Sequence, residues 1–164
     1  MRIMFDEIRN NKIKSYFLVA VFIVLIGALG AVAGLIYGNI YFGLILALII
    51  GLVYSLISYF SGDRMILSMS GAKPVTKKEY PYLYHTIEAV AIAADIPTPK
   101  AYVIEDKALN AFATGRDPQH AAVAVTTGLL ERLDRQELEG VIAHEISHIK
   151  NYDIRMMMLV TVLI

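Results

Sequence analysis

The sequence predicts an α+β membrane protein, in which a transmembrane helical hairpin is followed by a small domain of helices and a short β-sheet. Three observations support this fold class. Residues Ser15 to Gly62 form 48 consecutive uncharged positions. All 30 charged residues lie among the other 116, where they make up about 26%, as in an ordinary soluble domain. Capping signals and β-rich runs then alternate until a last apolar run, Met156–Ile164.

The uncharged stretch is too long for one crossing, because a helix of that length would measure about 72 Å against a hydrocarbon core of about 30 Å. Tyr16–Tyr37 and Ile40–Phe60 are each long enough to span, and Gly38-Asn39 between them is a tight-turn signal. Lys and Arg flank both outer ends. The positive-inside rule therefore predicts a multi-pass protein of the cell (inner or plasma) membrane, with its N-terminus and its domain in the cytoplasm.

A cleavable signal peptide is the alternative for the first apolar run, since a basic start and small residues at Ala31–Ala33 are present. The length of that run and the second span that follows almost at once favour retention. Small residues recur at four-residue spacing in both spans, at Gly30, Gly34 and Gly38 and at Gly43, Ala47, Gly51 and Ser55. Such stripes could pack on each other, form a face for a homo-oligomer, or reflect only the frequency of glycine in membrane helices.

Four segments follow from this pattern. They are a cytoplasmic N-terminal segment at 1–15, a transmembrane hairpin at 16–62, a cytoplasmic domain at 63–155 and the start of a third hydrophobic helix at 156–164. The last segment is too short to cross a bilayer, so we expect that a third span is cut off there. The lipid bilayer is the first partner that the sequence predicts.

The domain begins with a linker at about 63–76, after which Thr76 and Glu79 form a capping box that opens a helix to about Ala94. Three strand candidates come next, and the last two predict a β-hairpin with a longer loop: Ala101–Glu105, Ala108–Thr114 and Ala121–Thr127.

Composition excludes several functions. No cysteine is present, which rules out thiolate chemistry and Cys-ligated zinc, and a net charge of zero without a basic stripe argues against nucleic acid as a partner.

A second capping box, Asp134 with Glu137, introduces an amphipathic helix over Arg135–Lys150 that Asn151 can end. This helix contains the most informative motif of the chain, His144-Glu145-Ile146-Ser147-His148, which matches H-E-x-x-H. Residues four apart share one helix face, so both imidazoles can reach one Zn²⁺. Glu145 then lies beside the open coordination position, where it can act as general base on a zinc-activated water.

The motif leaves the metal site incomplete. A catalytic zinc of this type needs a third protein ligand, and no His or Glu follows His148. Asp153 is the only later carboxylate. It either hydrogen-bonds the outer nitrogen of a ligating His and fixes its tautomer, or merely caps the next helix.

The two spans, the string L-N-A-F-A-T-G at Leu109–Gly115 and the string V-I-A-H-E-I-S-H-I-K-N-Y-D at Val141–Asp153 resemble HtpX, a family of bacterial and archaeal membrane zinc metalloproteases. The resemblance implies a zincin-like domain of the gluzincin type, related to the CAAX-prenyl protease. It implies His144 and His148 as zinc ligands and Glu145 as catalytic base. The third ligand, a Glu on a later helix, is expected after Ile164.

The resemblance also implies proteolytic quality control under stress, with unfolded or misfolded membrane proteins as substrates. The N-A-F-A segment matches the family's strand beside the active site, and it gives four candidate substrate-binding residues: Asn110, Ala111, Phe112 and Ala113. An exposed edge strand there could pair with substrate through main-chain hydrogen bonds. An ordinary buried hairpin strand is the alternative.

Two functions are therefore predicted. The first is a membrane-bound zinc endopeptidase whose 164-residue portion alone has little or no activity. The alternative is a truncated, non-catalytic membrane protein or adaptor with an incomplete metal site. The reading frame beyond Ile164 distinguishes them, because a Glu on a later helix would complete the metal site.

Overall fold

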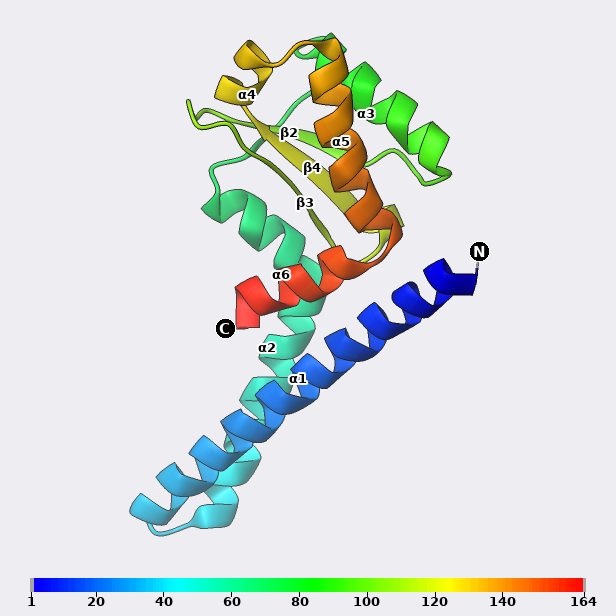
Figure 1. The fold of residues 1–164 in the computed structure, drawn as a ribbon. Helices are drawn as coiled ribbons and strands as arrows, with labels where there is room; N and C mark the ends of the chain where they lie inside the picture. The colour runs from blue at the N-terminus through cyan, green and yellow to red at the C-terminus, as the bar shows by residue number, and fades with distance from the viewer. Residues whose placement is uncertain (1, 164) are drawn as a thin grey trace.

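A computed structural model of the chain describes residues 2–163 and places a long helical hairpin below a compact head (Figure 1). The hairpin consists of α1 (Arg2–Ile36) and α2 (Ile40–Met69). Both helices are long and apolar enough to cross a membrane. The expected fold class, with membrane helices followed by a small mixed domain, is confirmed.

The turn of the hairpin lies where the sequence predicts it. Gly38 adopts a φ of +85°, in the left-handed region that glycine enters without a steric penalty. The Asn39 side chain then caps α2 by accepting a hydrogen bond from Phe42 N at 3.0 Å. The two helices are thus joined by three residues, none of which is Asp, Glu, Lys or Arg.

Helix α2 extends nine residues past the predicted end of the span at Phe60, so the linker expected over 63–76 is wrong in its first half. The extension is stabilised by tertiary packing, because Leu67 is buried against Ala122 and Ala124 of the sheet. The helix ends where Gly71 takes a φ of +66°. The membrane hairpin and the head therefore share one continuous helix.

The small residues of the two spans face each other and allow close approach of the backbones. A Cβ atom added to Gly30 would lie 2.6 Å from Gly43 O and would overlap Ala47 Cβ. One added to Gly34 would lie 2.6 Å from Asn39 O. Of the three uses that the sequence left open, packing within one hairpin is the one this structure contains.

This close approach predicts a matched pair of glycine substitutions. Gly30→Ala should lower the free energy of unfolding in detergent micelles by about 1–3 kcal/mol, the usual cost of overpacking. Gly140→Ala is the control, because a Cβ atom there meets nothing within 4 Å, and helix propensity should leave that variant unchanged or slightly more stable. Thermal melts followed by circular dichroism give the comparison. Equal losses in the two variants would show that the hairpin is not tightly packed at Gly30.

The head contains a four-stranded sheet in the order β1-β2-β4-β3. Its strands are β1 (Lys73–Pro74), β2 (Lys100–Ile104), β3 (Ala111–Gly115) and β4 (Ala121–Thr126). The predicted hairpin is confirmed, since β3 and β4 pair antiparallel, with Ala113 opposite Val123. Strand β2 pairs parallel to β4. Among the described residues, β3 is an edge strand.

The helices of the head are α3 (Pro81–Ala94), α4 (Thr127–Arg132) and α5 (Arg135–Lys150), with a 3-10 turn at Pro118–His120 and α6 (Asp153–Leu163) at the end. The predicted start of α3 at Thr76 is wrong. Glu79 accepts hydrogen bonds from Thr76 N and Oγ1 at 2.7 and 2.8 Å, but these residues form a turn. The helix begins only at Pro81, because a proline disfavours helical backbone in the residue before it and fits the first helical position.

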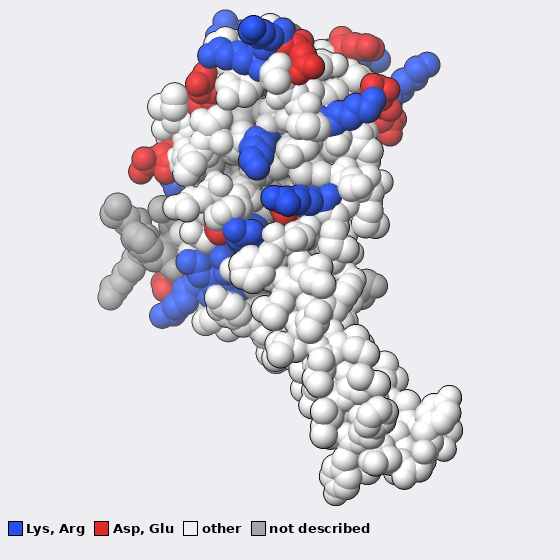
Figure 2. Space-filling model, turned by 180° about the vertical axis from the view of Figure 1, so that it is seen from behind, with Lys and Arg blue, Asp and Glu red and all other residues white. Residues whose placement is uncertain are grey.

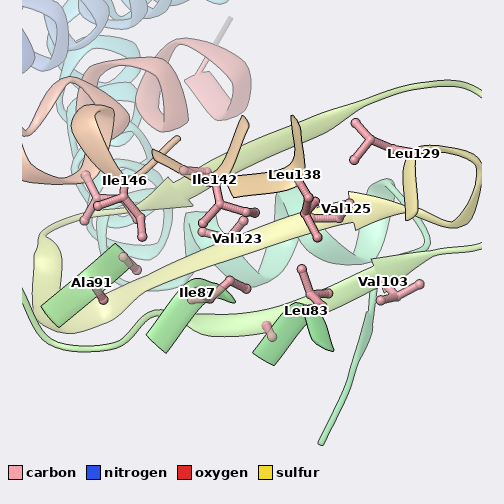
Figure 3. Packing of buried hydrophobic residues seen from close by; sticks show 14 of the residues in the cluster. Leu83, Ile87, Ala91, Val103, Val123, Val125, Leu129, Leu138, Ile142 and Ile146 are labelled. Atoms are coloured by element: carbon pink, nitrogen blue, oxygen red, sulfur yellow. The ribbon is translucent and has the colours of Figure 1, made fainter. Parts of the chain in front are cut away.

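Strand alternation gives the sheet two buried faces. One face packs against α3 and α5, and Figure 3 shows the side chains of this cluster meeting across β4. Its largest fully buried members are Leu83, Ile87, Val123, Val125, Leu138, Ile142, Ile146, Ile149 and Ile154. The opposite face, with Ala122 and Ala124, covers the end of α2. This core fixes α5 against β3 and β4.

Helix α6 lies across the hairpin where it meets the head (Figure 1). Met158 and Leu159 are buried against α1 residues that include Leu18 and Phe22. The Tyr54 hydroxyl of α2 donates a hydrogen bond to Val162 O at 2.7 Å. The last apolar run is therefore a packed helix, and the expectation about Ile164 lies outside the described residues.

Candidate metal centre

Helix α5 carries the H-E-x-x-H motif and is fixed at both ends. Its N-terminus has the predicted capping box, in which Asp134 accepts from Gln136 N and Glu137 N at 2.8 and 2.9 Å. The Glu137 carboxylate in turn accepts from Asp134 N. At the other end Asn151 is the C-cap, as the sequence predicts. One face of the helix is buried in the core, so the opposite face presents the motif.

The two histidines of the motif point their outer nitrogens at each other. His144 Nε2 and His148 Nε2 are 3.3 Å apart, and their rings lie nearly perpendicular, at 85°. Two nitrogens bound at 2.0–2.1 Å to one tetrahedral ion are separated by roughly 3.3–3.4 Å. The spacing of the pair therefore fits a shared Zn²⁺.

The other ring nitrogen of His148 is held by Asp153. Nδ1 of His148 lies 2.7 Å from Oδ2 of Asp153, at the first position of α6. Because a carboxylate can only accept a hydrogen bond, this contact places the ring proton on Nδ1. The lone pair of Nε2 then stays available to bind a metal ion. In the turn between α5 and α6, Tyr152 has a left-handed backbone conformation with a φ of 62°. This turn brings Asp153 next to His148. Of the two uses predicted for Asp153, the hydrogen bond to the outer nitrogen of His148 is present in the structure.

Glu145 is half-buried between the motif helix and β3. Its Oε2 accepts a hydrogen bond from Ala113 N at 2.9 Å. Burial raises the pKa of the Glu145 carboxyl above its usual value, and the Ala113 N–H and the two imidazoles oppose only part of that rise. A carboxyl group whose pKa is raised toward neutrality is better suited to take up and release a proton.

The donor set is incomplete within the part of the chain that the structure describes. No group of three or more His, Asp or Glu side chains suited to a metal ion occurs among residues 2–163. His85 and His120 are engaged elsewhere, with Glu88 at 3.5 Å and Asp117 at 2.7 Å. The candidate donors that the described residues bring together are thus His144 and His148, with Glu145 beside them in the same helix.

The hydrogen-bond register of β3 decides which candidate substrate residues face the motif. Thr126 N donates to Asn110 O at 3.0 Å, so the main chain of Asn110 is directed toward β4. Alternation then directs Phe112 toward β4 as well, and Ala111 and Ala113 away from it. The hydrogen bond between Ala113 N and Glu145 agrees with this register. Of the four candidate residues, Ala111 and Ala113 present main-chain groups on the side of the motif.

Sequence reasoning missed the contacts that α1 makes with the end of the motif helix. Asn11 Nδ2 donates to Asn151 O at 3.1 Å, and Lys12 Nζ lies 4.2 Å from the centre of the Tyr152 ring. These partners are about 140 positions apart in the chain, and each residue type alone is common at a surface. Nothing in the sequence pattern marks them as neighbours.

Comparison with known proteins agrees with the motif. Residues 77–164 match Peptidase family M48. The chain belongs to this family. A Protease HtpX homolog from Streptococcus gordonii is 46% identical over 153 residues, which cover 93% of this chain and 52% of that protein. A Protease HtpX homolog from Streptococcus pyogenes serotype M5 is 48% identical over 153 residues, covering 93% of this chain and 51% of that protein.

These similarities confirm the resemblance to HtpX. The M48 match contains the whole sheet except β1, together with α5 and its motif. Because 153 of 164 residues are covered by the relatives, the similarity also extends into the helical hairpin. The M48 chain spans about half the length of these two relatives.

Proposed function

We propose that this chain is part of a membrane-bound zinc endopeptidase that hydrolyses peptide bonds of misfolded or damaged membrane proteins in protein quality control. The observation that carries the proposal is the pair of Nε2 atoms 3.3 Å apart, with Glu145 next to one of them in the same helix. His144 and His148 are the proposed zinc ligands. The hairpin anchors the head to the cell membrane, with both of its ends in the cytoplasm.

The proposed chemistry divides between the metal and Glu145. A zinc ion held by the imidazoles supplies Lewis acidity, which acidifies water and polarises the scissile carbonyl. Glu145 accepts the proton of the attacking water at its carboxylate and later gives it to the leaving amine. Asp153 holds the His148 ring in position through Nδ1. The Ala113 N–H restricts the Glu145 side chain to the side of β3.

Substrate binding is assigned to the edge of β3 that faces away from β4, with Asn110, Ala111, Phe112 and Ala113 as the segment involved. An extended peptide that pairs with this edge uses main-chain hydrogen bonds, which accept many sequences. A cavity of about 340 Å³ adjoins the strand, and its walls include Phe112, Ala113, Ile66 and Met158. The apolar part of these walls suits side chains that are buried in folded membrane proteins and exposed in misfolded ones.

The alternative function, a non-catalytic membrane protein or adaptor, is favoured by one observation, the lack of a third donor among residues 2–163. Measurements on this chain and on a chain extended past Ile164 distinguish the two. We expect the extended chain to bind one zinc per molecule and to hydrolyse unfolded polypeptide in detergent, with loss of activity when a chelator is added. The 164-residue chain should bind zinc weakly and show little or no hydrolysis. An extended chain without zinc would support the adaptor.

The hydrogen bond to His148 predicts the effect of removing Asp153. Asp153→Ala in the extended chain should weaken zinc binding by about 10- to 100-fold, because the imidazole loses the partner that fixes its orientation and raises its basicity. Competition with a chromophoric chelator measures the affinity. Asp153→Asn, which keeps an acceptor oxygen, should recover part of the loss, and Asp63→Ala on α2 should change nothing. Unaltered zinc affinity in Asp153→Ala would mean that the carboxylate only caps α6.

A further inference from the structure

We propose that a cleft at the junction of hairpin and head binds the phosphate group of an anionic phospholipid. The cleft has a volume of about 460 Å³ and lies between α1, the turn that joins α5 to α6, and the loop after β3. Three cationic side chains line it, Lys12, Lys150 and Arg155. The inference rests on the proposed placement of the hairpin in a bilayer and is independent of the proposed catalysis.

Arg155 is the central observation. The residue is only 5% exposed. Nε donates to Arg116 O at 2.6 Å, and no carboxylate lies within 4.0 Å of the guanidinium among the side chains described from residue 6 onward. A buried cation without a counter-ion is costly. Its remaining N–H groups can donate to a phosphate in the bidentate manner that guanidinium favours.

Aromatic rings and a backbone oxygen hold the cations in place. The Arg155 guanidinium lies 5.3 Å from the centre of the Tyr152 ring and 5.6 Å from that of Tyr59. Lys12 Nζ contacts the same Tyr152 ring at 4.2 Å. Lys150 Nζ donates to Ala94 O at 2.7 Å. A phosphate that enters this cleft therefore meets cations that are already ordered, so less side-chain entropy is lost on binding.

Two acidic residues also line the cleft, Asp95 and Asp117. The Asp117 carboxylate already accepts hydrogen bonds from His120 N and His120 Nδ1 at 2.9 and 2.7 Å, and Arg116 Nε lies 3.7 Å away. Asp95 occupies the left-handed C-cap of α3, where it lowers the positive potential of the cleft. Cations still outnumber acids in the lining, which favours an anion.

The position of the cleft favours a lipid over free phosphate. Lys12 precedes the uncharged stretch by three residues, and the Tyr59 ring that contacts Arg155 lies at its other end. Arg116 Nη1 donates to Phe60 O at 3.2 Å. Figure 2 shows an uncharged stalk, with Lys and Arg gathered where it meets the head. In a bilayer this level is occupied by lipid headgroups, and basic pockets beside membrane helices bind anionic ones.

The test uses the 164-residue chain in a maltoside detergent, with dioleoyl phosphatidylglycerol or dioleoyl phosphatidylcholine added. Native mass spectrometry counts the lipids retained, and a titration gives the dissociation constant. We expect one phosphatidylglycerol per chain, bound at least about tenfold more tightly than phosphatidylcholine. Arg155→Gln should weaken the complex about tenfold, and Lys12→Gln about fivefold.

Lys14→Gln is the matched control, because it removes a cation from the same helix outside this cleft, and it should change binding less than about twofold. Thermal melts establish whether each variant folds. If Arg155→Gln does not fold, the lipid affinity of Lys12→Gln tests the site instead. Equal losses in Lys12→Gln and Lys14→Gln would reveal only diffuse attraction and overturn the site. So would equal binding of both lipids. Displacement of the lipid by an equal concentration of inorganic phosphate would assign the cleft to free phosphate instead.

Discussion

In a chain extended past Ile164, Glu145→Gln should abolish hydrolysis of unfolded polypeptide, with a loss of about 10²- to 10⁴-fold, and should leave zinc binding unchanged. The substitution keeps the size of the side chain and an oxygen that accepts from Ala113 N. It removes only the ability to take up a proton from the attacking water. Zinc content by atomic absorption and cleavage of a fluorescent unfolded substrate are the two measurements.

Glu139→Gln provides the matched control, because it makes the same change on an exposed position of the same helix, about 1.7 turns from Glu145. We expect its activity to equal that of the parent. Turnover retained in Glu145→Gln would refute the assignment of the base. Loss of both zinc and turnover would instead show that the carboxylate supports the metal.

The second large effect concerns the core that supports the motif helix. Ile142→Ala should lower the free energy of unfolding by about 2–5 kcal/mol, because the Ile142 side chain is 0% exposed and its removal leaves a cavity between α3, α5 and β4. Urea denaturation in micelles measures the change. Ile92→Ala makes the same change on α3 at a position that is 71% exposed, and should alter stability by less than about 0.5 kcal/mol. Similar losses in the two variants would place Ile142 outside the core.

Features encoded by neighbouring residues were predictable from the sequence. The hairpin turn at Gly38-Asn39, the capping box of Asp134 and the C-cap at Asn151 all depend on contacts within a few residues. The H-E-x-x-H spacing likewise fixes the approach of His144 and His148, because one turn of helix separates them.

Features that depend on distant contacts were not predictable in this way. The start of α3 was misplaced because the Thr76–Glu79 hydrogen bonds form in a turn as well as in a helix. Helix α2 continues beyond its apolar run because Leu67 packs against sheet residues that lie more than fifty positions further along the chain. The Ala113–Glu145 hydrogen bond depends on the β3 register, which no local pattern sets.

The turn between α1 and α2 has a consequence for how the hairpin reaches the membrane. The turn residues Tyr37, Gly38 and Asn39 carry no ionised side chain, and neither does the rest of the uncharged stretch from Ser15 to Gly62. Insertion of this hairpin as one unit moves no charge through the hydrocarbon, so the membrane potential does no work on it. Energised and de-energised vesicles should therefore take up the hairpin to the same extent.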